Sequence, residues 1–135
     1  MAKRRRRSNR NKEPSGTTFK RPRGYGNSCL DKLWAAKVKL LAGYKCELCG
    51  STEMLQSHHI HRCKHYGVRW NVINGACLCT DQHCNNDLSA HKNQLWFFRE
   101  MIRRRGDKWA DELIKATVED KNWRERLVSI KEELQ

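Results

Sequence analysis

Apolar residues recur every three or four positions over residues 29–42, which is the period of an amphipathic helix. One face of that helix would carry Leu30, Leu33, Trp34, Val38 and Leu41. The spacing Ser28-x-x-Asp31 resembles a capping box at its start, and Gly43 is suited to ending it. The pattern therefore predicts a helix whose apolar face belongs to the core.

The middle of the chain changes to short segments with strand character. We expect strands at residues 54–60 and 71–79, with a polar and basic loop over residues 61–70 between them. A helix is expected to begin near residue 80, where Asp81 is suited to the N-cap. These elements and the helices on either side predict an α+β fold that is mainly α.

Beyond about residue 93 the pattern is helical throughout and carries three apolar stripes. The stripes consist of Leu95, Phe98, Met101 and Ile102, then Trp109, Leu113 and Ile114, then Trp123, Leu127, Ile130 and Leu134. Trp96, Trp109 and Trp123 are predicted core anchors, and Arg103, Arg104 and Arg105 a solvated basic patch. Gly106 would end the first of these helices.

Length and composition narrow the class of protein. At 135 residues the chain is most simply one domain, and its 38% of hydrophobic residues form a small core that a bound metal would help to stabilise. No apolar run approaches the roughly 20 residues that span a bilayer, and no secretion signal is evident. We therefore expect no membrane partner and a location in a reducing cytoplasm.

Positive charge is concentrated in residues 1–28, which we predict to be a disordered arm. This segment holds ten basic residues and one acidic residue, Glu13, so it supplies nine of the thirteen net positive charges. Its densest run consists of Arg4, Arg5, Arg6 and Arg7. Such an arm is suited to contacting nucleic-acid phosphates, and the alternative is a solubilising tail.

Four of the seven cysteines fall into two close pairs, which is typical of a structural zinc site. Cys46-x2-Cys49 has the standard spacing, and Gly50 after it permits a tight turn. The second pair, Cys79 and Cys84, is less regular, and Cys77 is a rival ligand two residues before Cys79. We favour Cys46, Cys49, Cys79 and Cys84 as ligands of a structural Zn²⁺, against the alternative of buried cysteines without metal.

Histidines lie between and beside these pairs. His58 and His59 are adjacent. Fourteen residues separate His59 from Asn74, and eight separate Asn74 from His83. Neighbouring side chains of an extended strand point to opposite sides, so His58 and His59 should have different roles. A histidine has an ordinary pKa near neutrality and can act as a metal ligand or a general base.

The segments CELCG, LQSHHIHR, WNVINGACLC and HCNNDLSAHK resemble small phage-type HNH endonucleases of the ββα-metal class. CNNDLSAHK followed by WFFREMIRRRGDKWADEL also resembles the end of phage recombination-enhancement proteins, which act on branched DNA. The resemblance covers about residues 30–115. It departs from the pattern at Gln82, where a cysteine is common, and in the stretched second cysteine pair.

This resemblance implies a role for each residue of the motif. His58 and His83 would ligate a catalytic divalent ion (Mg²⁺, Mn²⁺, Ni²⁺ or Zn²⁺), and His59 would be the general base. Asn74 would pin the hairpin and orient His59 by hydrogen bonds. Arg62, three residues after His59, is a candidate to hold the scissile phosphate, against the alternative that it belongs to a solvated basic loop.

The third ligand of the catalytic ion is expected from the segment that follows His83, where three residues are candidates. Asp87 lies four residues after His83 and would share its helical face, and Asn85 is a ligand type used by some relatives. His91 lies eight residues after His83, and a break near Asn85 and Asn86 would bring it close. We favour His91.

The expected function is therefore metal-dependent endonucleolytic cleavage of DNA, by nicking or cutting. Residues 29–93 would form a ββα-metal nuclease domain with its zinc, and residues 94–135 a helical extension. The alternatives are a non-catalytic zinc-finger protein that binds nucleic acid and a structure-specific resolvase of branched DNA. A phage-encoded protein would act in the cytoplasm of its bacterial host, where a packaging or recombination protein is the partner to expect.

Overall fold

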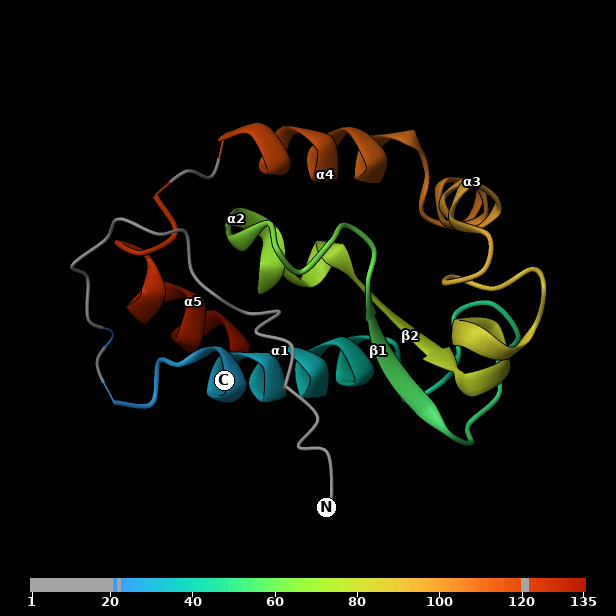
Figure 1. Cartoon of the computed structure of the whole chain (residues 1–135), viewed down its shortest axis with the longest axis horizontal. Coiled ribbons are helices and arrows are strands. Elements are labelled where there is room, and N and C mark those ends of the chain that lie inside the picture. The colour runs from blue at the N-terminus through green and yellow to red at the C-terminus, as the bar shows by residue number, and fades with distance from the viewer. Residues whose placement is uncertain (1–20, 22, 120–121) are drawn as a thin grey trace, which may run out of the picture.

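The computed structural model describes residues 21, 23–119 and 122–135. In these ranges the fold is α+β and mainly α, as predicted, with one small antiparallel sheet (Figure 1). The elements are α1 (Asn27–Leu41), β1 (Leu55–His59), α2 (Tyr66–Arg69), the 3₁₀ turn η1 (Val72–Asn74), β2 (Gly75–Cys79), the π-helical turn η2 (Asp81–Asn85), α3 (Gln94–Arg105), α4 (Asp107–Glu119) and α5 (Leu127–Leu134). The predicted arm, with Arg4, Arg5, Arg6 and Arg7, lies outside the described residues. None of the described helices is long and apolar enough to cross a membrane.

In the first helix the predicted stripe is confirmed at three residues, whereas Leu41 is 62% exposed and the predicted cap is absent. Leu30, Trp34 and Val38 are buried, as expected. The N-cap is Gly26, and no side chain caps it. The capping-box prediction is therefore wrong: Asp31 turns toward the protein interior and pairs with Arg69.

The two strands form a hairpin in which Leu55 pairs with Cys79 and His59 with Gly75. The chain approaches α1 most closely at Gly75, where an added Cβ atom would lie 2.3 Å from Val38 Cγ2. Only a residue without a side chain fits there, so Gly75 sets how closely α1 packs beneath the sheet. This packing fixes the position of the paired residue, His59.

The connection between the strands is more ordered than the sequence suggested. The predicted basic loop contains the helical turn α2, and Tyr66, Val68 and Trp70 are buried rather than solvated. The second strand is shorter than predicted, because residues Val72–Asn74 form a 3₁₀ turn held by the Asn71 side chain, which accepts a hydrogen bond from Ile73 N. The apolar residues of this segment favour burial over an open loop.

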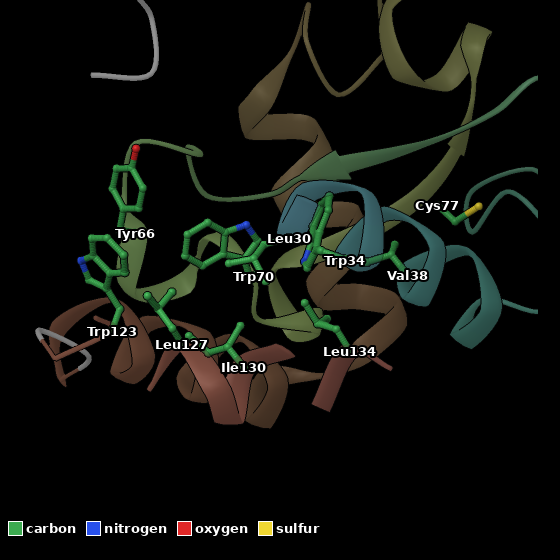
Figure 2. Close-up of a cluster of buried hydrophobic side chains, with 10 residues drawn as sticks. All are labelled: Leu30, Trp34, Val38, Tyr66, Trp70, Cys77, Trp123, Leu127, Ile130 and Leu134. Atoms are coloured by element: carbon green, nitrogen blue, oxygen red, sulfur yellow. The ribbon is translucent and has the colours of Figure 1, made fainter. Parts of the chain in front are cut away.

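The first hydrophobic core joins α1, α2 and α5 (Figure 2). Tyr66 stacks on Trp123 with ring centroids 4.7 Å apart, and Trp70 meets Trp123 edge-on at 5.8 Å. Figure 2 shows Leu127 and Ile130 along the same side of the cluster, below these rings. The segment around α5 therefore packs directly against the turn that connects the two strands.

The second core joins the sheet to α3 and α4. Phe97, Met101 and Leu113 are buried in it, whereas Leu95 is 88% and Ile114 54% exposed. The predicted stripe is therefore wrong at Leu95 and Ile114, because the face of α3 (Gln94–Arg105) that packs in this core carries Phe97 and Met101. Two apolar residues that the pattern assigned to the core are left at the surface.

Arg105, which was predicted to belong to a solvated basic patch, instead links separate parts of the fold. The Arg105 guanidinium forms hydrogen bonds to both carboxylate oxygens of Glu47, each 2.7 Å from Nη2, and to the Gly75 carbonyl at 2.8 Å. Its side chain is only 21% exposed. Arg105 thereby connects the end of α3 to the Cys46–Cys49 turn and to the start of β2.

Candidate metal centres and active site

Three of the four predicted zinc ligands come together. Cys46, Cys49 and Cys79 offer sulfur atoms that all lie within 4.8 Å of one another, and Cys49 Sγ is 3.6 Å from Cys79 Sγ. The first two thiols share a tight turn, in which Gly50 N donates to Cys46 O at 2.8 Å and Gly50 adopts a positive φ of 75°. β2 supplies the third. This cluster can hold a metal ion.

The pKa values of these thiols are consistent with a bound cation, which would stabilise their ionised forms. At Cys46 burial opposes ionisation, but backbone N–H groups of Cys79, Cys49 and Leu48 outweigh it and lower the pKa of the thiol. At Cys49 the Ser51 backbone N–H favours the thiolate, but burial and the neighbouring Cys79 and Cys46 raise the pKa to about 11. Three crowded thiols cannot all ionise without a cation to balance them.

The other two candidate cysteines lie elsewhere. Cys84 is not part of the cluster, and its thiol donates to the Thr80 carbonyl oxygen at 3.6 Å. The wide π-helical turn of η2 carries this thiol away from the Cys46–Cys79 group. Cys77 is fully buried in the first hydrophobic core, so it is not a rival ligand.

A second cluster consists of His58, His83 and His91, whose ring nitrogens also lie within 4.8 Å of one another. His83 Nε2 and His91 Nε2 face each other at 2.9 Å. His83 Nδ1 bonds the side-chain oxygen of Gln56; because that oxygen can only accept, Nδ1 carries the proton and Nε2 has a free lone pair. Nitrogens about 2.0–2.1 Å from a tetrahedral ion would be roughly 3.3 Å apart, so small shifts would fit these three to a cation.

The chain folds back after η2 to bring His91 to this cluster. Asn86 is extended, with φ −71° and ψ 153°, and His91 N then donates to His83 O at 3.0 Å. The helix predicted from residue 80 is therefore limited to one π-helical turn, and the predicted break at Asn85 and Asn86 is present. Asp87 lies outside the cluster, and Asn85 Nδ2 donates to Asp81 Oδ1 at 3.0 Å.

His58 is kept neutral by its surroundings. Burial lowers its pKa to about 3, helped by repulsion from His83 and His91, and the Phe97 ring lies edge-on at 5.2 Å. A neutral imidazole is the form that binds metal. His58 therefore has a lone pair available to a cation over the whole physiological pH range.

His59 faces the other side of β1, as the alternation of the strand predicts. Its ring stacks on Trp34 with centroids 3.8 Å apart and planes 4° from parallel. Nε2 lies 2.9 Å from the Arg69 carbonyl oxygen, which can only accept, so Nε2 carries the proton. Nδ1 is left as the basic nitrogen. Burial chiefly lowers the pKa of His59, which keeps the ring in its basic form.

The residue that holds His59, Arg69, was not found from the sequence. Its guanidinium is 4% exposed and pairs with both carboxylate oxygens of Asp31, at 2.9 and 2.7 Å. The same Asp31 accepts from Trp70 Nε1 at 2.9 Å, and Arg69 Nη1 donates to Cys63 O at 3.0 Å. No local pattern could have revealed this pair, because its members are 38 residues apart in the chain.

Asn74 is fully buried and pins the loop that follows β1. Its Oδ1 accepts from His61 N at 2.6 Å, and its Nδ2 donates to His61 O at 3.1 Å and Val68 O at 3.2 Å. The predicted pinning of the hairpin is present. Among the described residues, however, Asn74 makes no hydrogen bond to His59, whose ring is oriented by the Arg69 carbonyl instead.

A groove of about 880 Å³ connects these features. His58, His59, His83 and His91 line it, together with Arg62, the predicted phosphate ligand. Arg62 is exposed at its edge. The three histidines that could hold a metal ion and His59 therefore line one common space.

Comparisons with protein-family models, with curated proteins and with solved structures found no match to this chain.

Proposed function

We propose that this protein is a metal-dependent DNA endonuclease of the HNH type. The observation that supports it best is the state of His59 beside the histidine cluster. One ring nitrogen donates to the Arg69 carbonyl and the other is unprotonated, and His59 lines the same groove as His58, His83 and His91. A structural zinc finger needs no such residue.

In this proposal the two clusters hold different ions. Cys46, Cys49 and Cys79 bind a structural Zn²⁺, and water takes the fourth position, because Cys84 lies outside this cluster. His58, His83 and His91 hold the catalytic divalent ion, which can be Mg²⁺, Mn²⁺, Ni²⁺ or Zn²⁺. When bound, that ion polarises the phosphate and stabilises the leaving oxygen.

The protein side chains then divide the remaining work. His59 Nδ1 accepts a proton from the attacking water, and the Arg69 carbonyl stabilises the ring as it becomes positively charged. Trp34 prevents the ring from rotating, because the two planes are stacked. Arg62 and the arm with Arg4, Arg5, Arg6 and Arg7 attract the DNA backbone, with no sequence preference of their own.

The test compares wild type with His59→Gln on supercoiled plasmid, with Mg²⁺, Mn²⁺, Ni²⁺ or Zn²⁺ and with EDTA. Glutamine can still donate to the Arg69 carbonyl but offers no base, so folding should persist while the nicking rate falls about 10²- to 10⁴-fold. His65→Ala is the control, because His65 is an exposed histidine that does not line the groove.

Two results would overturn the proposal. His59→Gln protein that nicks at the wild-type rate would remove His59 from the reaction. Wild type that shifts DNA on a gel but cuts neither plasmid nor a four-way junction with any metal would favour the zinc-dependent nucleic-acid-binding alternative.

A further inference from the structure

The groove beside the histidine cluster has an apolar wall that nothing in the described chain covers. Leu95 on α3 and Ile114 on α4 are 88% and 54% exposed, and Phe98 lines the groove with them. Metal binding and proton transfer need none of these side chains. An exposed apolar wall directly beside a polar reaction site is typical of a surface that binds part of a ligand.

Another part of the lining is basic. Arg62 and Lys64, from the loop after β1, belong to it and are exposed. No Asp or Glu is among the described residues that line the groove. A ligand that fits both parts of the lining has an anionic part next to an apolar, flat part.

A nucleotide has this combination, with a phosphate and an aromatic base. In a duplex the faces of the bases are stacked on one another and only their edges are accessible in the grooves. An unpaired nucleotide can instead place the face of its base on apolar and aromatic side chains. The volume of about 880 Å³ lies within the usual range for sites that enclose a small organic group.

We propose that the groove binds an unpaired nucleotide of the DNA substrate, with its base against Leu95, Phe98 and Ile114 and its phosphate toward Arg62 and Lys64. This inference rests on the proposed function and defines its substrate: DNA that is single-stranded or locally unpaired at the site of cleavage. Continuous duplex DNA would bind through its backbone alone.

The test measures binding of a fluorescent 12-nucleotide thymidine strand and of a 12-base-pair duplex by anisotropy. All proteins carry His59→Gln so that no cutting occurs. The groove variant is Leu95→Asn with Ile114→Asn. The matched control is Val118→Asn with Val128→Asn, which changes two apolar residues that are 65% and 55% exposed and do not line the groove. These substitutions leave the net charge unchanged.

We expect the groove variant to bind the single strand about tenfold more weakly than the control and to bind the duplex equally well, because base stacking is lost and phosphate contacts remain. Equal affinity of both variants for the single strand would overturn the inference, and so would an equal loss of duplex binding. If the control sediments as a dimer and the groove variant as a monomer, with single-strand binding unchanged, the apolar wall contacts a second copy of the chain instead of a base. Failure of the nicking assay leaves this binding comparison intact, so the two proposals can fail separately.

Discussion

Replacing Asp31 by asparagine should destabilise the protein, because Asp31 pairs with Arg69, the residue whose carbonyl group orients His59. Asp31 accepts three hydrogen bonds, two from Arg69 and one from Trp70. An asparagine can keep its oxygen toward Arg69 Nε and Trp70 Nε1, but its NH₂ group then faces Arg69 Nη2, where two donors meet. Arg69 would keep its charge and lose its counter-charge.

The size of the effect follows from the burial of the pair. The Arg69 side chain is 4% exposed and that of Asp31 33%. Breaking a fully buried ion pair costs about 3–5 kcal/mol, and water at the exposed end of Asp31 reduces this to about 2–3 kcal/mol. For a domain of this size the midpoint of urea unfolding should fall by about 1 to 2 M.

The assay is urea unfolding followed by tryptophan fluorescence, with zinc present throughout. Glu100→Gln is the matched control: it removes the same type of charge from a pair with Arg103, whose side chain is 65% exposed, and should cost clearly less stability than Asp31→Asn. If Asp31→Asn costs no more than Glu100→Gln, the Asp31–Arg69 pair does not stabilise the fold and the reasoning is refuted.

Two further predictions concern the packing beneath the sheet and the cysteine cluster. Gly75→Ala should cost about 1–3 kcal/mol in the same unfolding assay, because its Cβ would overlap Val38 Cγ2. The cost should shrink when Val38→Ala is already present, and strict additivity would contradict the predicted overlap. Cys46→Ser should reduce the zinc content measured by atomic emission, whereas Cys84→Ser should retain it, because its thiol bonds the Thr80 carbonyl. Equal zinc loss in both variants would establish Cys84 as the fourth ligand.

The periodicity of the sequence was sufficient for the fold class and for the parts that local patterns encode. The apolar stripe of α1 gave its buried residues, and the Cys46-x2-Cys49 spacing gave one half of the cysteine cluster. The alternation of β1 correctly separated His58 from His59, because a strand places neighbours on opposite sides whatever surrounds it.

The predictions that were wrong concern features that depend on contacts between distant segments of the chain. The helix expected from residue 80 becomes a single π-helical turn, and its N-cap is Thr80 rather than Asp81. The carbonyl group that orients His59 belongs to Arg69. The ion pair between Asp31 and Arg69 holds the turn that carries this carbonyl group in place. Leu95 has the right spacing for a buried stripe, but it is 88% exposed, because the face of α3 that packs in the second core carries Phe97 and Met101.

The packing of Trp123 and α5 against α2 has a consequence for how the protein is made. The ribosome completes both metal-binding clusters and His59 before it synthesises the segment that packs on Tyr66 and Trp70. Until that segment emerges, these aromatic rings lack their cover and the turn that carries the Arg69 carbonyl lacks its support. A nascent chain thus completes its cysteine and histidine clusters first and acquires a firmly held His59 ring last.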